Sequence, residues 1–564
     1  MRTPLATLAA VALLVGCSSE TGKGGGASSA LDIPAVQAGD ISIDTMKSVT
    51  ETLSGDDFEG RAPGTVGEEK TLKLLSEKFA AAGLQPGNGD SWFQQVPLVE
   101  ITANAGTVSP LTVTGGKSGG MAFSYGTEMV VTSHREQESV AINDSEMVFV
   151  GYGINAPELG WNDYQGLDVK GKTVIILVND PDFENATLDG DFGGRAMTYY
   201  GRWTYKYEEA ARQGAAMALI VHDTEPAAYG WNVVESGWTG PQFYAQSANG
   251  GANQTMANGW IQKDVAAKIM TAAGRDLDSE MAAAKEKAFT GKPLGLNASV
   301  SFENSITRTL SNNVIGILPG SERPDEYVFY TAHWDHLGRC KPAPDGDDIC
   351  NGAIDNATGT AALVALAEAH NKAGAPDRSI VFLAVTAEES GLLGSTYYAN
   401  NPVYPLAQTV GGVNMDALLP AGPSKDVTVV GQGKSELDRY LAAVLEQTGQ
   451  TATPDPSPQN GYYYRSDHFS LAKRGVPMLY VDAGPDLVDG GIEAGKALAA
   501  DYTQNRYHNP KDEYDPDWDW SGVAAQLQIF YRVGRMLAMS ESWPNWVEGD
   551  EFRAARDHSR EGAD

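Results

Sequence analysis

The sequence predicts an α/β fold: a mixed, mostly parallel sheet with helices on both faces, interrupted by an inserted β-rich unit. From Asn312 onward, apolar strand-like runs alternate with helical patterns, which favours parallel strands joined by crossover helices. The chain has 564 residues, so two or three domains are expected instead of one core. Between 128 and 302 the pattern changes to short strand-like runs and Gly-, Asn- and Trp-rich stretches, which indicates a separate compact unit.

The first 17 residues are typical of a secretory signal. Arg2 precedes an apolar run at 5–15, which is too short to cross a membrane as a permanent helix. The letters LVGC at 14–17 resemble the bacterial lipobox, which implies cleavage before Cys17 and a lipid on its thiol. We therefore expect an exported protein, lipid-anchored at the cell envelope (periplasm), with the outer membrane favoured because Ser18 follows. An ordinary signal with a chance cysteine is the alternative. Residues 18–40 are predicted to be a flexible tether.

Charge and cysteine content limit the classes of partner. The formal net charge is −32 and the pI is near 4.6, which argues against nucleic acid or an anionic membrane surface as partner. Of the three cysteines, Cys340 and Cys350 remain once Cys17 is assigned to the lipobox, and in an exported protein this pair favours a disulfide. Such a bond would hold the loop between His333 and Asp355.

Residues 41–127 are predicted to form the N-terminal part of the main domain. Two helices are expected first, because Leu72, Leu75 and Phe79 recur at helical spacing and Gly83 is a good helix stop. Strand and turn follow at 92–113. In the inserted unit, the stretch GYGINAPELGWNDYQGLDVKGKTVIILVND at 151–180 resembles the protease-associated (PA) domain found in several peptidase families. We therefore expect a PA-like inserted domain at 128–302.

Residues 303–545 are predicted to be the catalytic domain, and 546–564 a charged C-terminal tail. The expected strands are NVIGILPG, YVFYTAH, SIVFLAV, TVGGVNMDAL, DVTVVG and VPMLYVDAG. Helices are expected over 358–372, 435–448 and 522–539.

Metal-type side chains follow these strands. His333 ends YVFYTAH, Glu388 and Glu389 follow SIVFLAV, and Asp416 follows GGVNM, while Asp355 precedes a helix that it could also merely cap. Because ligand sites form at the carboxyl ends of parallel strands, we expect these side chains to converge. Imidazole and carboxylate groups suit zinc, with manganese or cobalt left open. In a glutamate pair, one carboxylate can bind metal while its neighbour faces the attacking water.

Six motifs in order carry a family resemblance: AHWDH, GAIDNATGT, AEESGLLGS, NMDAL, YRSDHFS and YHNPKDEYD. Together they resemble the di-zinc aminopeptidase family, which includes bacterial leucyl-type aminopeptidases, glutamate carboxypeptidase and the metal-free transferrin receptor. The resemblance covers about 45–125 and 305–539. It implies the zinc-exopeptidase fold, a peptide substrate and two Zn²⁺ per chain.

The resemblance also implies a role for each matching residue. His333 and Asp416 would bind one zinc, Glu389 and His508 the other, and Asp355 would bridge them. Two further roles are catalytic: Glu388 would be the general base, and Tyr463, flanked by Tyr462 and Tyr464, would steady the oxyanion. The resemblance places His468 in the pocket wall without a metal, and His336 is expected either to contact and support the metal ligands or to be structural.

The sequence thus predicts a zinc-dependent exopeptidase, and an aminopeptidase before the alternatives. A carboxypeptidase or dipeptidase of the same family is the nearest alternative, with Arg465 as the cation that would hold a substrate carboxylate. A receptor-like module that has lost its metals is opposed by the intact ligand set, and a cyclising aminoacyltransferase is a further alternative on this fold. Side-chain preference and oligomeric state are left open.

Overall fold

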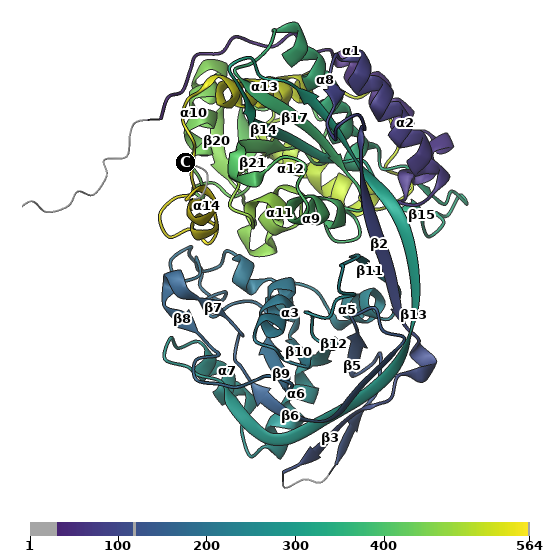
Figure 1. Ribbon diagram of the computed structural model, residues 1–564, viewed down its shortest axis with the longest axis vertical. Helices are drawn as coiled ribbons and strands as arrows, with labels where there is room; N and C mark the ends of the chain where they lie inside the picture. Colours follow the sequence, from purple (N-terminus) through teal and green to yellow (C-terminus); the bar gives the residue numbers. More distant parts are fainter. Residues whose placement is uncertain (1–30, 117–119, 562–564) are drawn as a thin grey trace, which may run out of the picture.

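The computed structural model describes residues 31–116 and 120–561, which form two lobes joined by long strands (Figure 1). The predicted signal, Cys17 and the first part of the tether lie outside the described residues. Within the described part of the chain, no helix is both long and apolar enough to cross a membrane.

The upper lobe in Figure 1 contains the sheet that the sequence predicts. Strands β17, β14, β18 and β21 are paired in parallel, whereas β13 runs antiparallel to β17 and β19 runs antiparallel to β21. A mixed, mostly parallel sheet is therefore confirmed. The order across the sheet is β2 (Phe93–Ala103), β13 (Lys292–Leu318), β17 (Arg378–Val385), β14 (Arg323–His333), β18 (Thr409–Asn414), β21 (Met478–Ala483), β19 (Asp426–Val429) and β20 (Thr451–Pro454).

Helices cover both faces of this sheet, as predicted. Strand β17 shows why: Ile380 and Phe382 belong to one buried cluster, while the intervening Val381 and Leu383 belong to another. Alternation along a strand with both faces buried requires a layer of apolar side chains on each side. One face carries α1 (Ile43–Leu53), α2 (Val66–Ala81), α8 (Gly359–Lys372), α10 (Leu437–Thr448) and α13 (Ser521–Met539), and the other carries α9 (Leu393–Asn400) and α11 (His468–Ala472).

The lower lobe is a second sheet with its own helices. Its order is β4 (Met121–Phe123), β3 (Leu111–Gly115), β13, β6 (Ser139–Phe149), β9 (Thr173–Leu177), β10 (Met217–His222), β12 (Ala257–Gln262) and β5 (Met129–Thr132). The main helices are α3 (Trp203–Arg212), α5 (Trp231–Trp238), α6 (Lys263–Ala272) and α7 (Leu277–Ala284). Because β3 and β4 belong to this sheet, the lobe begins before residue 128, where the sequence pattern placed its start.

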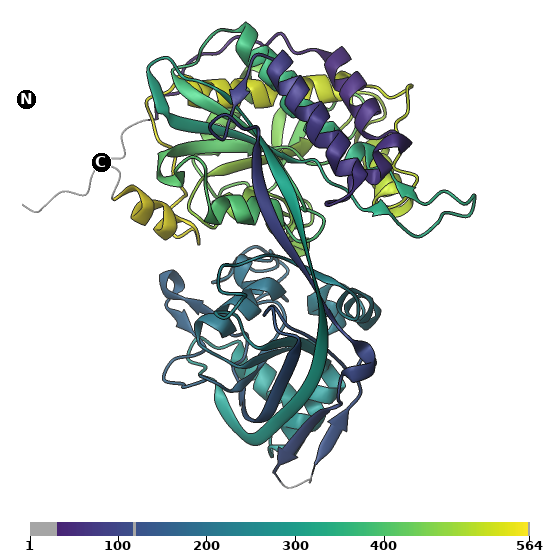
Figure 2. The same ribbon diagram turned by 45° about the vertical axis from the view of Figure 1, so that its right-hand side comes forward.

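Strand β13 is shared by the two sheets. It has 27 residues, and Figures 1 and 2 show it curving from the lower lobe into the upper lobe beside β2. Its first part pairs with β3 and β6, and its last part pairs with β17. The middle part pairs with β2 from Asn304 to Val314, so a continuous antiparallel ladder links the lobes.

Several short elements complete the fold. The upper lobe also contains β1 (Gln85–Pro86), β15 (Gly338–Arg339), β16 (Ile349–Cys350), α12 (Gly491–Asp501) and α14 (Arg553–Arg560). The lower lobe also contains β7 (Asn155–Ala156), β8 (Trp161–Asn162), α4 (Thr224–Ala227) and β11 (Gln242–Ala245), the last of which pairs with β2. The predicted disulfide between Cys340 and Cys350 is present.

The structure differs from the prediction at both ends of the chain. Residues 31–40 lack regular structure, yet Leu31, Ile33 and Val36 pack against the upper core, so this part of the predicted tether is not free. The predicted charged tail is also packed. Trp546 is 1% exposed, and the buried Arg556 of α14 donates to the carbonyl of Thr409. The sequence did not indicate this packing, because the segment is rich in charged residues. Such side chains can nevertheless bury their apolar stems and form buried hydrogen bonds.

Candidate metal centre

The predicted ligands meet at one edge of the upper sheet, where parallel strands end. His333 is the last residue of β14, Asp416 lies just beyond β18, and the Glu388–Glu389 pair lies just beyond β17. Asp355 lies in the turn of helix over Ala353–Thr358 that leads into α8. His508 reaches the same place from the loop after the helical turn Tyr502–Arg506.

Asp355 lies between two imidazoles. Nε2 of His333 is 3.3 Å from Oδ1 of Asp355 and 3.2 Å from Oδ1 of Asp416. Nε2 of His508 is 3.3 Å from Oδ2 of Asp355 and 3.0 Å from Oε2 of Glu389. One carboxylate thus offers an oxygen to each of two ligand sets. The structure therefore brings together all five side chains that the sequence pattern singled out.

Glu388 stands beside this cluster. Its Oε2 is 4.0 Å from Nε2 of His333, and its carboxylate has no hydrogen bond from any other described residue. The ligand atoms of His333, Glu388 and Glu389 lie within 4.8 Å of one another, as do those of His333, Asp355 and Asp416. The carboxylates of the cluster lie close enough to repel one another. A divalent cation bound between them and the imidazoles would offset that repulsion.

Burial and neighbouring charges move the pKa values of the cluster apart. Burial raises the pKa of Glu388 well above its usual value, and the Asp416 and Glu389 carboxylates raise it further. Burial alone would also raise the pKa of Asp355, but hydrogen bonds from His333 and His508 hold it well below the usual range. For His508, burial lowers the pKa, and its bonds to Asp355 and Glu389 outweigh that and raise it to about 10.

Other residues hold the ligands in position. Asp512 accepts the backbone N–H groups of Ile354 and Asp355, with distances of 3.0 and 3.1 Å. The carboxylate of Asp335 accepts the N–H groups of Glu388 and Glu389. The Nδ1 atom of His333 lies 3.1 Å from the carbonyl oxygen of Asp335 and 3.7 Å from its carboxylate Oδ1. Such outer contacts set the direction in which ligand atoms point.

Tyr507, the neighbour of His508 in the chain, stacks on its ring with centroids 3.8 Å apart, whereas Asp512 holds Asp355 and not His508. A further supporting residue was not recognised in the sequence. Arg61 is fully buried and donates to the carbonyls of Trp334, Asn351 and Gly352, which flank the site. In the sequence, Arg61 lies in the turn-rich stretch GRAPG. Such a stretch indicates a loop but does not indicate that the arginine is buried.

Tyr463 is not brought to the cluster. Its ring stacks on Phe552 and lies 5.3 Å below Nζ of Lys434, and its hydroxyl has no hydrogen-bond partner among the described residues. We therefore assign it no catalytic role. His468 is fully buried, packs against Tyr463 and Tyr480, and makes no ring hydrogen bond to a described residue.

His336 contacts two of the predicted ligands, in the supporting position that the sequence allowed for it. Its Nδ1 is 2.5 Å from Oε1 of Glu389, and its ring contacts that of His508. Together with Asp355 and Glu389 it forms a third group of atoms within 4.8 Å of one another. In this arrangement His336 orients the Glu389 carboxylate, whose other oxygen faces His508.

Two arginines face each other across the seam between the lobes. Arg465 immediately precedes Ser466, whose hydroxyl donates to Oδ2 of Asp416 at 2.6 Å. Arg202, just before α3 in the lower lobe, lines the same small recess as Arg465. Burial, together with the nearby Arg465 charge, lowers the pKa of Arg202 to about 10. Among the described residues, neither guanidinium forms an ion pair with a carboxylate.

Comparison with known proteins identifies a family for the segment that contains the cluster. Residues 313–531, which contain His333, Asp355, Glu388, Glu389, Asp416 and His508, match the model of "Peptidase family M28". This part of the chain belongs to peptidase family M28. The donor set of the M28 segment, imidazole nitrogens and carboxylate oxygens, fits zinc.

Individual relatives match only part of this chain and only part of their own length. Aminopeptidase NAALADL1 of Mus musculus is 35% identical over 130 residues, which are 22% of this chain and 16% of the mouse protein. A probable zinc metalloprotease of Pyrenophora teres f. teres is 36% identical over 146 residues, 25% of this chain and 26% of the fungal protein. Among solved structures, an aminopeptidase from Aneurinibacillus sp. strain AM-1 covers 89% of this chain and 95% of its own, with 19% identity and a TM-score of 0.47.

Proposed function

We propose that this protein is a zinc-dependent exopeptidase that removes N-terminal residues from peptides with the help of two zinc ions. The observation that carries the proposal is Asp355, whose two carboxylate oxygens each face a different imidazole. His333 and Asp416 would complete one ligand set, and His508 and Glu389 the other. The M28 match over 313–531 and the similarity to an aminopeptidase and to a probable zinc metalloprotease support this class of activity.

Bound zinc would supply a polarised scissile carbonyl and a water of lowered pKa. The chain supplies the proton transfers. Glu388 lies beside His333 without a hydrogen-bond partner among the described residues, so its carboxylate is free to take a proton from the attacking water. The same carboxyl then passes the proton to the leaving amine nitrogen as the peptide bond breaks. Asp335 keeps Glu388 in place through its backbone N–H.

The decisive experiment uses zinc-loaded protein and one short peptide in three forms: free, N-acetylated and C-amidated. An aminopeptidase cleaves the free and amidated forms and fails on the acetylated form, because it recognises the free ammonium group. Cleavage of the acetylated form would contradict the proposal. Absence of any cleavage with zinc bound would exclude ordinary exopeptidase action and favour the aminoacyltransferase alternative.

The arginine pair supports a second candidate function, a carboxypeptidase or dipeptidase. Arg202 and Arg465 share a recess beside the cluster and, among the described residues, have no carboxylate partner, although the chain carries 73 acidic residues. Guanidinium groups bind carboxylates in a planar, two-point manner. A free substrate carboxylate would relieve the repulsion between these two charges.

Amidation tests this second function directly. If it is correct, amidating the peptide reduces kcat/KM at least tenfold, and Arg202→Gln and Arg465→Gln reproduce that loss only for the free peptide. Arg439→Gln, on the outer face of α10, is the matched control and should leave kcat/KM unchanged. Equal cleavage of the free and amidated peptides by all variants would exclude the carboxylate-reading function.

We also propose that the mature protein is lipid-anchored at Cys17 and that the lower lobe is a PA-like domain that selects substrates. The LVGC letters at 14–17 and the stretch at 151–180 support these assignments. Mass spectrometry of the processed protein from its own cells tests the anchor, because a diacylglycerol adduct on an N-terminal Cys17 is expected. Excising the lobe and finding an unchanged peptide-length preference would contradict the selection role.

A further inference from the structure

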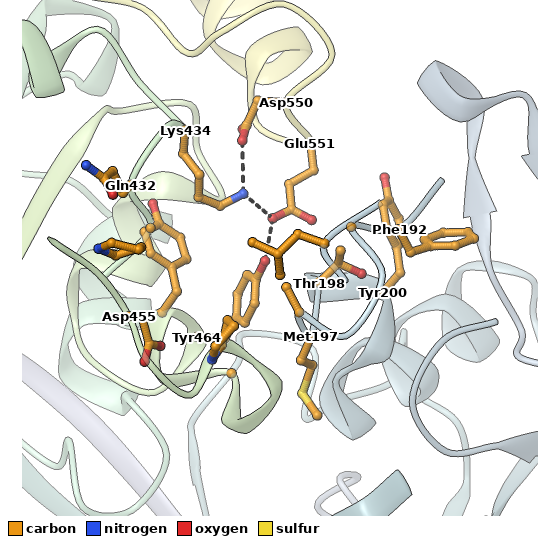
Figure 3. Close-up of a pocket in the computed structure, with 18 of the residues that line it drawn as sticks. Phe192, Met197, Thr198, Tyr200, Gln432, Lys434, Asp455, Tyr464, Asp550 and Glu551 are labelled. Carbon is orange, nitrogen blue, oxygen red and sulfur yellow. Dashed lines mark hydrogen bonds and ion pairs between the residues drawn. The ribbon is translucent and has the colours of Figure 1, made fainter. Parts of the chain in front are cut away.

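A cavity of about 320 Å³ lies between the two lobes and is separate from the candidate metal centre, because none of the five predicted ligands lines it (Figure 3). Its volume falls in the range of sites for small organic ligands. Loops of the lower lobe form one wall, and the other wall comes from the upper lobe and from the segment Gly549–Glu551, which precedes α14.

Aromatic rings dominate the walls. Phe192 and Tyr200 come from the lower lobe, and Tyr462, Tyr463 and Tyr464 come from the upper lobe. Figure 3 shows Phe192 and Tyr200 on the side opposite Tyr464. Tyr463 is 6% exposed and its hydroxyl has no hydrogen-bond partner among the described residues, while Tyr462 is 43% exposed. Electron-rich ring faces around a small space attract organic cations.

Most of the charged groups that line the cavity are carboxylates, whose negative charge attracts cations. Lys434 is the one cationic side chain in the lining, and it lies between Asp550 at 2.9 Å and Glu551 at 3.0 Å, as Figure 3 shows. Asp455 also lines the cavity and forms no ion pair with a described residue; its Oδ1 accepts the N–H of Ser457. Together with Glu158 and Asp191, the lining carries five carboxylates against one ammonium group.

We propose that this cavity is a second binding site, whose ligand is an organic cation: an ammonium or guanidinium group on an apolar or aromatic body. Asp455 supplies the counter-charge, and the tyrosine faces hold the apolar body and the cation. A free aromatic amine and the basic side chain of a peptide share this chemistry. The site does not depend on the peptidase activity proposed above.

A ligand here would also join the lobes. The cavity is bounded by direct contacts across the seam, since the N–H of Met197 donates to the carbonyl of Pro458 and the N–H of Tyr199 donates to Glu551. Occupation of the cavity would therefore stabilise the lobe arrangement that the structure shows.

The test is calorimetric titration of the full zinc-loaded protein with phenethylammonium, with 2-phenylethanol as the uncharged analogue and N-acetyl-lysine amide as the peptide-side-chain probe. We expect phenethylammonium to bind about tenfold more tightly than 2-phenylethanol, the ratio expected when a cation meets desolvated rings and a carboxylate. Binding of N-acetyl-lysine amide with similar affinity would identify peptides as the source, and binding of phenethylammonium alone would identify free amines.

Variants locate the site. Asp455→Asn and Tyr462→Ala should each weaken phenethylammonium binding about tenfold, while Asp278→Asn, exposed on α7 and not part of the lining, should leave it unchanged. An affinity unaffected by Asp455→Asn and Tyr462→Ala, or equal affinities for the amine and the alcohol, would overturn the proposal. Because heat of binding and not turnover is measured, failure here leaves the exopeptidase proposal standing, and failure of that proposal leaves this one standing.

Discussion

Glu388 and Glu389 are neighbours in sequence, yet their surroundings give them different properties. The Glu389 carboxylate contacts His336 and His508, and although burial and the Asp355 charge act against it, these hydrogen bonds leave its pKa lowered. Burial and nearby carboxylates raise the pKa of Glu388 instead. In the proposed mechanism, Glu389 would thus stay ionised as a ligand, and Glu388 would hold and release a proton.

The Glu388→Gln variant tests this division. It keeps the shape of the side chain and removes the proton acceptor, so kcat should fall by about 10²–10⁴-fold while zinc content stays at the wild-type level. Zinc per chain and kcat are to be measured on the same samples. Glu322→Gln, an exposed control, should change neither, and wild-type kcat in Glu388→Gln would refute the assignment.

Asp512 provides a second test at the residue scale, because it touches the ligand Asp355 only through the backbone. The Asp512→Asn variant replaces a charged acceptor by a weaker neutral one, so the Ala353–Thr358 turn should hold Asp355 less firmly. Zinc affinity, measured by competition with a chelator, should fall about 10–100-fold. Asp517→Asn, exposed in the same loop, is the control; equal zinc affinities for the two variants would show that Asp512 has no positioning role.

At the scale of elements, the strands and helices agree with the sequence pattern wherever apolar periodicity is strong. Helix α8 begins one residue from the expected start, and α13 covers the expected span. Apolar periodicity gave no signal at α14, because its buried residue is Arg556 and its other residues are polar or alanine. This helix is held in place by the arginine stem and by its hydrogen bonds to backbone carbonyls. It therefore lacks the apolar stripe by which a surface helix is recognised in a sequence.

The bond between Cys340 and Cys350 ties the hairpin of β15 and β16. Replacing both cysteines by serine should lower the free energy of unfolding by about 2–3 kcal/mol, because the unfolded chain regains the entropy of the open loop. Urea unfolding of the two proteins measures the difference. Adding reductant to the wild type should reproduce the loss and leave the variant unaffected; identical midpoints throughout would contradict a stabilising role.

At the scale of the whole molecule, the seam between the lobes combines one ion pair with a group of rings. Lys473 lies 2.7 Å from Glu208, with each side chain 33% exposed, and such pairs contribute about 0–1 kcal/mol. Tyr199 of the lower lobe is 9% exposed and packs against Tyr464 and Phe469 of the upper lobe. Burial of aromatic area therefore contributes more to the seam than the ion pair does.

This comparison predicts different effects for two variants. Tyr199→Ala should cost about 3 kcal/mol and speed amide hydrogen exchange on both sides of the seam, whereas Lys473→Met should cost less than about 1 kcal/mol. Exchange measured by mass spectrometry over 195–202 and 458–470 gives the readout. A larger effect for Lys473→Met would mean that charge, and not ring packing, holds the lobes together.

The mostly parallel α/β sheet, the disulfide and the set of side chains that converge at the strand ends could all be predicted from the sequence. These features follow from local periodicity, cysteine pairing and the rule that parallel strands end at one edge of a sheet. The three-dimensional arrangement was needed to show that Asp512 holds Asp355, that Arg61 is buried beside the site, and that Tyr463 and Gly549–Glu551 line a cavity between the lobes. Those contacts join residues that are distant in the chain through single polar or aromatic side chains, and a pattern of residue types contains no information on which distant partner each side chain meets.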